Sequence, residues 1–284
     1  MSCEILIKSF MRHDVLLMTL QSLRKHFNGR IIVLDDSPEL TTIIESQINQ
    51  FNVELHKTEP NIGLSAGRNR MLKMVQSDYF LLMDNDFVLS DPDAITKLTL
   101  VSQHTNATIV GGLLWDCGAL KARPWCGYFD YDPDHELVLK FYDREKIPKK
   151  QINGINYYEC RFCQNFFLGR TEDFLRYNLS WDDNLKNQEH EDFFIRLPRK
   201  LKVVETPDIY VTHYPIKENA TFDNYTGFPN MQEDPLYVQF RCDKIWRKLI
   251  KHKYNLSGSF FREYRNIYFD WTQYAFPKVN VKLL

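Results

Sequence analysis

Two aspartates one residue apart, Asp84 and Asp86, follow the apolar run of residues 79–83. Carboxylates at this spacing in a tight turn can present oxygens to a hard divalent cation such as Mn²⁺ or Mg²⁺. A cation held there would neutralise a diphosphate leaving group in a group-transfer reaction. Taken alone this DxD motif is a weak signal, because aspartate and asparagine are common turn residues and a solvated loop also explains them.

Polar side chains follow other apolar runs in the same part of the chain. Asp35 and Asp36 come directly after the second run, a position suited to accepting hydrogen bonds from a base or ribose. Segment 61–69 leads into a helix N-terminus, which attracts phosphate, and its Arg68 adds a planar cation. This segment is neither a Walker loop nor a Gly-x-Gly-x-x-Gly fingerprint. The first run closes with Ser9-Phe10-Met11-Arg12, an aromatic and a cation at the same predicted edge.

Alternating strand and helix patterns position these groups. Short apolar runs predict strands at residues 5–7, 31–34, 53–56 and 79–83, and helical spacing predicts helices at 15–23, 41–51 and 65–75, the last capped by Ser65. That order predicts a parallel, right-handed, doubly wound α/β sheet. Ligands of such sheets bind outside the carboxyl ends of the strands. Because each acidic cluster follows a strand, we expect the clusters to meet at one edge.

The rhythm loosens after Asp86. The patterns predict a helix at 94–102, a strand at 108–114, renewed order at 157–168, 189–197 and 203–213, and a helix at 234–249. Residues 115–156 mix aromatic, proline and charged residues without clear periodicity, which predicts a long irregular segment of functional or mobile character. We find no internal repeat, low-complexity tract or clear linker, so one domain with a C-terminal extension is the simplest interpretation.

Composition narrows the function classes. The chain has 284 residues, with 36 Lys+Arg against 37 Asp+Glu and a net charge of −1, which argues against a nucleic-acid partner. Hydrophobic residues at 44% and charged residues at 26% are typical of a globular protein, and 14% aromatic residues suit surfaces that stack on sugars and bases. The sequence contains no signal-peptide pattern and no apolar stretch of 18 residues. Six cysteines are too few for a disulfide scaffold, so we expect a cytoplasmic, reduced protein.

Several short motifs, taken as an ordered set, resemble inverting nucleotide-sugar glycosyltransferases of family 2 and its GT-A relatives. The motifs of the first half are Lys8-Ser9-Phe10-Met11-Arg12, Leu20-Gln21-Ser22-Leu23, Asp35-Asp36-Ser37, Asn61-x-Gly63 with Gly67-Arg68-Asn69, and Asp84-x-Asp86. Those of the second half are similar to the β1,4-N-acetylgalactosaminyltransferases of ganglioside synthesis: residues 164–171, His190-Glu191-Asp192-Phe193-Phe194 and Val211-Thr212-His213. The resemblance covers about residues 4–215.

The resemblance implies a GT-A, Rossmann-like fold with a mostly parallel central sheet flanked by helices and a C-terminal helical extension. It divides the chain into a catalytic domain at 1–215 and an extension at 216–284. Within the domain, 1–112 would bind the nucleotide-sugar and 113–215 would carry acceptor binding and catalysis. The implied activity is metal-dependent, inverting transfer of a sugar such as GalNAc or GlcNAc from a UDP-sugar to a glycan or glycolipid hydroxyl, with Mn²⁺ or Mg²⁺ as cofactor.

Two alternatives stay open. A sugar nucleotidyltransferase would also use paired carboxylates on a Rossmann-like sheet, but it usually needs a glycine-rich phosphate loop with a lysine near the N-terminus, and residues 7–10 offer none. A glycan- or nucleotide-sugar-binding module without catalysis would keep the pocket. The DxD motif and the later acidic cluster are both intact, which gives no support to lost catalysis.

The resemblance assigns roles by position. Asp86 would be the main metal ligand, and Asp84 would contact the ribose or the metal. His213 would be a further metal ligand, although a purely structural role at the end of its strand explains this histidine equally well. The donor would contact Ser9, Arg12, Asp35, Asp36, Asn61, Gly63, Arg68, Asp84 and Asn85.

An inverting transfer needs one carboxylate to take the proton of the acceptor hydroxyl. The family pattern places this base at Asp192, directly before Phe193, with Glu191 as its acceptor-binding neighbour. Glu189 and Glu191 compete for the role. Without the family context, acidic residues at the start of a helix are more often explained by the helix dipole.

Three weaker features complete the expectations. Trp125, Tyr128, Phe129 and Trp181 are candidate sugar-stacking residues, of which half or more would be core residues. Cys160 and Cys163 could bind zinc together with Cys117 and Cys126, but buried thiols are favoured. The basic, amphipathic segment 244–254 could contact an anionic membrane peripherally, but a helix packed on the domain is favoured.

Overall fold

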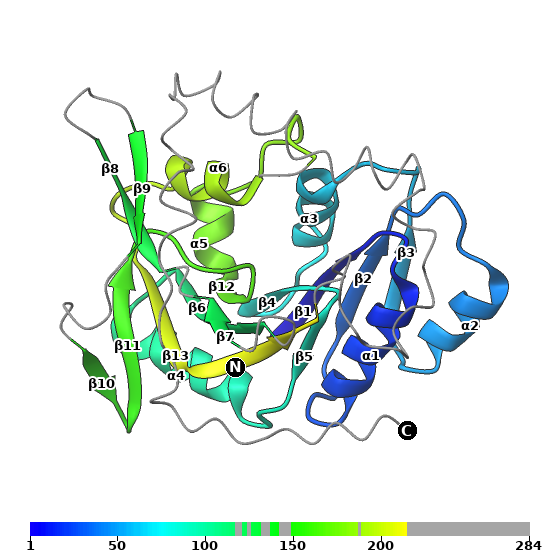
Figure 1. The fold of residues 1–284 in the computed structure, drawn as a ribbon, viewed down its shortest axis with the longest axis horizontal. Helices are drawn as coiled ribbons and strands as arrows, with labels where there is room; N and C mark the ends of the chain where they lie inside the picture. Colours follow the sequence, from blue (N-terminus) through cyan, green and yellow to red (C-terminus); the bar gives the residue numbers. More distant parts are fainter. Residues whose placement is uncertain (117–120, 124–125, 132–136, 142–148, 187–188, 215–284) are drawn as a thin grey trace.

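The computed structural model describes residues 1–116, 121–123, 126–131, 137–141, 149–186 and 189–214 (Figure 1). The elements in chain order are β1 (Cys3–Ser9), α1 (His13–Arg24), β2 (Ile31–Asp35), α2 (Thr42–Asn49), β3 (Glu54–Lys57), α3 (Leu64–Leu72), β4 (Tyr79–Asp84), β5 (Phe87–Leu89), α4 (Ala94–Thr105), β6 (Ile109–Asp116), β7 (Lys121–Arg123), β8 (Gly127–Tyr131), β9 (Leu137–Phe141), β10 (Lys150–Ile152), β11 (Ile155–Cys160), β12 (Phe167–Arg170), α5 (Thr171–Arg176), α6 (Glu189–Arg196) and β13 (Val203–His213). None of the helices in these ranges is both long and apolar enough to span a lipid bilayer.

One large mixed sheet organises the fold. Its strand order is β10-β11-β13-β6-β12-β4-β1-β2-β3, with β5 on β13 and β7 on β6. Strands β4, β1, β2 and β3 pair in parallel, and so do β6 and β13. Strand β12 runs antiparallel to both of its neighbours, β4 and β6. The expected α/β fold with a mostly parallel central sheet is confirmed.

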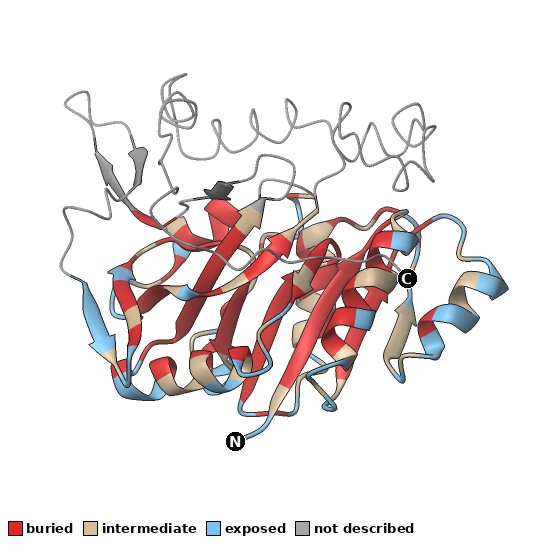
Figure 2. Ribbon diagram, turned by 60° about the horizontal axis from the view of Figure 1, so that its bottom comes forward, coloured by how far each residue is buried: buried red, intermediate tan, exposed pale blue. Residues whose placement is uncertain are grey.

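Side-chain alternation along the strands separates two apolar layers. In β1, Ile5 and Ile7 belong to a buried cluster with Leu16 and Leu20 of α1, whereas Leu6 belongs to a second cluster on the opposite face. The first cluster includes residues of α1, α2 and α4, and the second includes residues of α3, α5 and α6. The strands between the helices are almost wholly buried (Figure 2). Parallel strands covered on both faces read as continuous apolar runs, which is why the sequence predicts them well.

The helix starts agree with the sequence in one case and differ in another. Thr41 caps α2 and accepts a hydrogen bond from the Ile44 backbone at 3.3 Å, as expected for a threonine N-cap. The prediction of Ser65 as the cap of the next helix is wrong, because Gly63 takes that position with φ +92°. Glycine adopts this conformation at little cost, and the cap lies two residues earlier than expected, with Ser65 buried inside the helix.

Residues 115–156 contain more regular structure than expected. Where the structure describes this segment, it forms the antiparallel β8–β9 hairpin and the short strands β7 and β10. Strands of three to five residues are too short for a visible periodicity, so the irregular prediction is wrong for these parts. The predicted helix at 234–249, the basic segment 244–254 and the extension at 216–284 lie outside the described residues.

Candidate functional site

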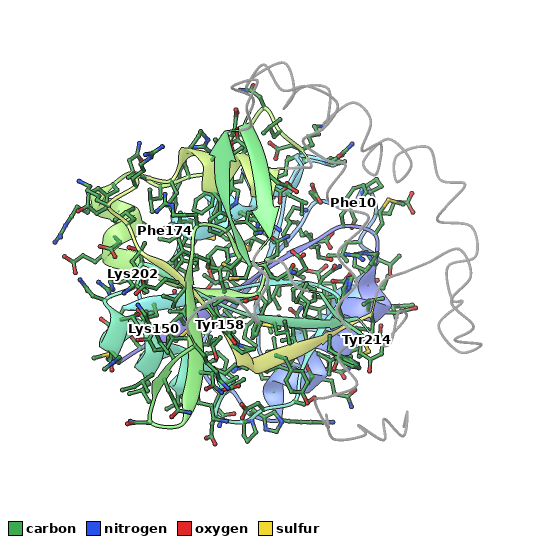
Figure 3. The ribbon with its side chains drawn as sticks, turned by 60° about the vertical axis from the view of Figure 1, so that its left-hand side comes forward. Phe10, Lys150, Tyr158, Phe174, Lys202 and Tyr214 are labelled. Atoms are coloured by element: carbon green, nitrogen blue, oxygen red, sulfur yellow. The ribbon has the colours of Figure 1, made fainter. Side chains whose placement is uncertain are left out.

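The carboxyl ends of three parallel strands meet at one edge of the sheet. The strand register sets Ser9 beside Asp35 and Lys8 beside Asp84. Strand β13 reaches the same region, because the His213 backbone pairs with Phe87, directly after the DxD turn. Figure 3 shows Phe10 and Tyr214 on one side of the molecule, and Lys150 and Lys202 on the other. The expected convergence of the acidic clusters is confirmed for the strand ends.

Asp86 lies in a small charged group at this edge. The Arg12 guanidinium donates to Asp86 Oδ2 at 2.7 Å and also to Asn85 Oδ1. The Nε2 atom of His213 lies 3.5 Å from the same Asp86 oxygen. Burial raises the pKa of Asp86, but Arg12 and His213 outweigh it and hold that pKa well below its usual range. Asp86 is therefore a buried, ionised carboxylate at neutral pH.

Two polar atoms of the DxD turn have no partner among the described atoms. They are Asp86 Oδ1 and Asn85 Nδ2, both buried. Buried polar atoms in folded proteins are usually hydrogen-bonded, so this unpaired carboxylate oxygen at the strand ends is suited to contact a cation or a donor group. The turn itself is fixed from behind, where Thr19 Oγ1 donates to the Asn85 carbonyl at 2.8 Å.

Asp84 faces other elements than Asp86 does. Its Oδ1 atom accepts from Arg68 at 2.9 Å, and its Oδ2 atom accepts from Asn165 at 3.3 Å. Within the described ranges, no three His, Cys, Asp or Glu side chains are grouped so that they could hold one metal ion. The predicted ligands Asp84, Asp86 and His213 thus include one close pair, Asp86 with His213, and a third member held elsewhere.

Asp36 is buried, and both of its carboxylate oxygens are bonded to other residues of the protein. It pairs with the Lys8 ammonium, and its Oδ2 atom accepts from the Gly63 backbone at 3.1 Å. Burial raises the pKa of Asp36 and lowers that of Lys8, and their mutual attraction opposes both shifts. The Asp36 carbonyl also accepts from Asn61 N at 2.9 Å, so this residue shapes the 61–63 loop.

Asp35 is engaged in a similar way. It accepts from the Ser37 backbone at 2.9 Å and lies 3.1 Å from His13 Nε2. Burial raises the pKa of Asp35, but His13 and Ser37 lower it by more, so the net pKa is below the usual value. Both predicted nucleoside contacts, Asp35 and Asp36, therefore have their side-chain oxygens bonded within the fold.

Arg68 lies inside the protein, with 1% of its surface exposed. One guanidinium nitrogen donates to Asp84, another donates to Glu189 of α6, and the group lies 5.7 Å from the centre of the Trp181 ring. Burial lowers the pKa of Arg68, but the two carboxylates raise it by more. The guanidinium of Arg68 therefore has almost no exposed surface with which to make its predicted contact with base or phosphate.

Helix α6 carries the predicted base. Asp192 is fully buried, and its Oδ2 atom accepts from Arg196 at 2.7 Å, while Glu191 is buried close by. His190 contacts the Cys163 carbonyl, and burial lowers its pKa to about 3, so its ring is neutral. All three carboxylates of the cluster, Glu189 included, are enclosed at the start of one helix.

The candidate acceptor residues are only partly described. Trp181 is 2% exposed and stacks on Phe193, with 4.9 Å between ring centroids, which leaves little ring surface for a sugar. Trp125 lies outside the described residues, and of Tyr128 and Phe129 the structure describes the backbone alone, in β8.

The cysteines pack in the apolar core. Cys126, Cys160 and Cys163 belong to the cluster under α6, and burial raises the pKa of the Cys163 thiol. Cys117 lies outside the described residues. The structure therefore gives these three thiols the packing role that the sequence favoured.

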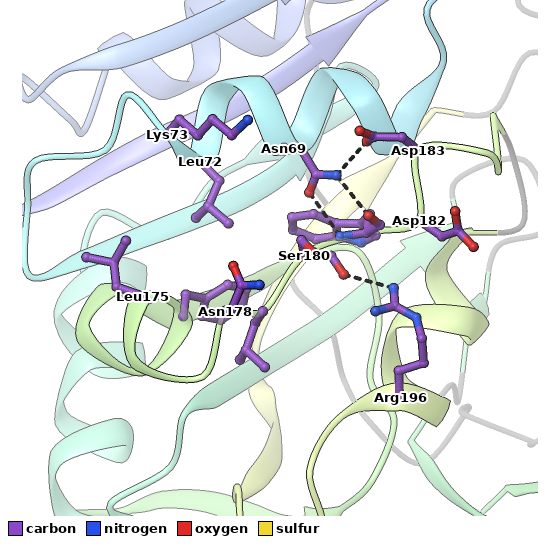
Figure 4. A pocket seen from close by; sticks show the side chains of 12 residues that line it. Asn69, Leu72, Lys73, Leu175, Asn178, Ser180, Asp182, Asp183 and Arg196 are labelled. Carbon is purple, nitrogen blue, oxygen red and sulfur yellow. Dashed lines mark hydrogen bonds between the residues drawn. The ribbon is translucent and has the colours of Figure 1, made fainter.

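A pocket of about 520 Å³ opens between α3, α5 and the segment that leads to α6 (Figure 4). Asn69 donates to Asp183 at 2.6 Å on one side of it, and Arg196 donates to the Ser180 carbonyl at 2.8 Å on the other. Trp181 also lines it, and the indole Nε1 has no partner among the described atoms. Through Arg196 the pocket wall is bonded to Asp192.

Sequence reasoning missed several residues of this edge. Lys8 was seen only as part of a motif, although a lysine inside an apolar strand signals a buried counter-charge. Asn165 and His13 had no signal of their own. The pairing of Arg68 with Glu189 joins positions 121 residues apart and has no local pattern.

Ligands of open α/β sheets bind outside the carboxyl ends of the strands, which is where these charged groups lie. The sequence model of glycosyl transferase family 2 matches residues 4–175, more than half of the chain. The chain belongs to this family.

Sequence relatives agree with this assignment. Mouse beta-1,4 N-acetylgalactosaminyltransferase 2 is 28% identical over 240 residues, which are 78% of this chain and 43% of that protein. Rat beta-1,4 N-acetylgalactosaminyltransferase 1 is 25% identical over 208 residues, 72% of this chain and 38% of that protein. The chain thus spans less than half the length of these relatives.

Solved structures share the fold. Residues 1–349 of S. aureus TarS in complex with UDP-GlcNAc give a TM-score of 0.56 at 12% identity, over 94% of this chain and 76% of that one. Another crystal structure of the same TarS fragment gives a TM-score of 0.55 at 14% identity, over 75% of this chain and 60% of that one. The expected GT-A fold is confirmed.

Gly67 tests how tightly Lys8 is held. A Cβ atom at Gly67 would lie 2.4 Å from Lys8 Cδ, too close for both to stay in place. We expect Gly67→Ala to lower the free energy of unfolding by about 1–3 kcal/mol, because it displaces Lys8 from Asp36. Urea denaturation measures this. Alanine alone favours a helix by about 1 kcal/mol over glycine, so a gain in stability would contradict the close approach.

Proposed function

We propose that this chain is the catalytic part of an inverting glycosyltransferase that moves an N-acetylhexosamine, GalNAc or GlcNAc, from a UDP-sugar to a hydroxyl of a glycan or glycolipid. Family membership supports sugar transfer. The names of the mouse and rat relatives support GalNAc, and the UDP-GlcNAc complex of TarS supports a UDP-sugar donor. The observation that carries the proposal is the ionised Asp86, with one free oxygen, at the carboxyl edge of the sheet.

The donor end would use this edge. Asp86 Oδ1 is an unpaired, buried, anionic oxygen, and His213 Nε2 lies beside the other oxygen of the same carboxylate. An oxygen and an imidazole fit Mn²⁺, and a carboxylate also fits Mg²⁺, with Asp84 as a further candidate ligand. Such a cation would supply positive charge to the departing diphosphate. Arg12 brings a second positive charge to the same place, and it orients the Asn85 side chain.

The acceptor end would use α6. Asp192 would take the proton of the acceptor hydroxyl as this oxygen attacks the anomeric carbon from the face opposite the diphosphate. Its bond to Arg196 keeps the carboxylate in one orientation. Glu191 would bind the acceptor beside it. Arg196 also lines the pocket of Figure 4, which would carry part of the acceptor.

Removing the Asp86 carboxylate should separate cation-dependent binding from the rest of the fold. We expect Asp86→Ala to weaken UDP binding in the presence of Mn²⁺ by more than ~10-fold. Isothermal titration of UDP with Mn²⁺ and with EDTA measures this, and chelation should weaken binding to the wild type but not to the variant. Asp93→Ala, an exposed aspartate at the start of α4, is the matched control. Equal affinities of wild type and Asp86→Ala for UDP with Mn²⁺ would refute the assignment.

The base is tested by isosteric changes on α6. We expect Asp192→Asn to lower transfer by at least ~100-fold, the usual scale for loss of a general base, while UDP affinity stays within about twofold. Glu191→Gln should mainly raise KM for the acceptor. Initial rates of UDP release across a panel of UDP-sugars and acceptors measure both effects, with circular dichroism to check the fold. If Glu191→Gln shows the 100-fold loss and Asp192→Asn does not, the base is Glu191.

A further inference from the structure

Arg68 joins three parts of the chain that are distant in sequence. It belongs to α3, and its guanidinium donates to Asp84 at the end of β4 and to Glu189, the first residue of α6. Arg68 and Glu189 are both almost wholly buried, while 26% of the Asp84 side chain is exposed. We call these three groups, Asp84, Arg68 and Glu189, the bridge. Its partly exposed member is the DxD carboxylate Asp84, and its buried end is Glu189 on the helix that carries the proposed base.

The bridge depends on both carboxylates. Burial raises the pKa of Glu189, and the Arg68 guanidinium opposes this shift by stabilising the charged form. A buried charge that loses its partner is strongly unfavourable, so the three groups hold one another in place. The planar guanidinium also presents separate nitrogens to the two carboxylates, an arrangement that a lysine ammonium cannot reproduce.

Trp181 packs against the guanidinium of the bridge. Its ring lies 5.7 Å from the guanidinium and stacks on Phe193 of α6 at 4.9 Å. Asn69, the residue after Arg68, accepts from Trp181 N at 2.9 Å and donates to the Trp181 carbonyl at 2.8 Å. The guanidinium is therefore fixed by its own helix, by this ring and by the two carboxylates.

A second attachment lies just before α6. The Lys186 carbonyl accepts from Leu64 N at 3.0 Å, and its ammonium group donates to the Asn61 carbonyl. A Cβ at Gly63 would lie 2.7 Å from Lys186 Cα, so the two backbones are in close contact. The segment entering α6 is thus tied to the loop whose other contacts are with Asp36.

We propose that Glu189 is a positioning residue, which acts through Arg68 to hold the DxD carboxylate Asp84 and the start of α6 in one fixed arrangement. This inference rests on the proposed function, because only a transfer reaction requires the two sites to be held in this arrangement. The bridge keeps the carboxylates of α6 at a fixed distance from the proposed donor edge, so that the acceptor oxygen is positioned to attack the anomeric carbon. Misplacement of reacting groups by about 1 Å can cost ~10²-fold in rate.

The test uses Glu189→Gln, which keeps the size of the side chain and removes its charge. We expect kcat to fall by about 10- to 100-fold, while KM for the UDP-sugar and the affinity for UDP change less than about threefold. Arg68→Lys, which keeps the positive charge but not the fork, should reproduce this split. Because both variants break the same bridge, the double variant should be no more than about threefold slower than the slower single variant.

The exposed pair of Arg70 and Glu59 provides a matched control near the same helix. Glu59→Gln and Arg70→Lys make the same chemical changes outside the bridge and should leave kcat within about twofold. Tryptophan fluorescence gives a further readout, since Trp181 contacts the guanidinium. The emission of Glu189→Gln should differ from that of the wild type, and the difference should vanish in a Trp181→Phe background.

The outcomes separate the inference from the proposed function. A wild-type chain that binds no UDP and transfers no sugar contradicts the proposed function itself. An active wild type with unchanged kcat in Glu189→Gln overturns the inference, as does a fall in kcat matched by an equal loss of UDP affinity. If Glu189→Gln does not fold, Arg68→Lys decides by the same criteria. A loss above ~10⁴-fold in Glu189→Gln with a normal Arg68→Lys would make Glu189 the base and also overturn the inference.

Discussion

Charge buried away from water is the constraint on which this edge of the sheet depends. Five carboxylates of this region have a cation beside them: Asp36 has Lys8, Asp86 has Arg12, Asp84 and Glu189 share Arg68, and Asp192 has Arg196. Desolvation of a charge costs several kcal/mol, which is recovered only when the partner and further hydrogen bonds are in place. Most of these partners come from different elements, so the edge acquires its charge pattern only when the whole fold is assembled.

Close backbone approach makes two of these pairings possible. Lys8 passes over α3 where Gly67 leaves room for its side chain, and Lys186 lies against Gly63 at the start of the same helix. Gly63 also has φ +92°, a conformation that other residues adopt only with strain. The two glycines of the 61–69 segment therefore admit neighbouring parts of the chain.

The sequence predicted the elements better than the contacts among them. The buried runs of β1, β2 and β4 are apolar on both faces, so their positions followed from the apolar runs, and the meeting of their ends followed from the alternation of strands and helices. The partner of Arg68 did not, because Glu189 is 121 positions away and stands in a cluster with two other carboxylates. Local signals also failed where two were in competition, as at Ser65, because Gly63, two residues earlier, caps the helix. The short strands of residues 115–156 were missed because they have no periodicity of their own. They are defined by their pairing with neighbouring strands.

The two aspartates of the DxD turn contact different partners. Asp86 is directed to Arg12 and His213, from the two ends of the described chain, whereas Asp84 is directed to Arg68 and to Asn165 of the second half. The motif therefore contacts residues from both the early and the late part of the described chain. A change that removes the Asn165 contact from Asp84 would therefore alter the proposed donor edge from outside it. In a protein whose reaction needs donor and acceptor held together, a shared motif of this kind couples the two ends by its geometry.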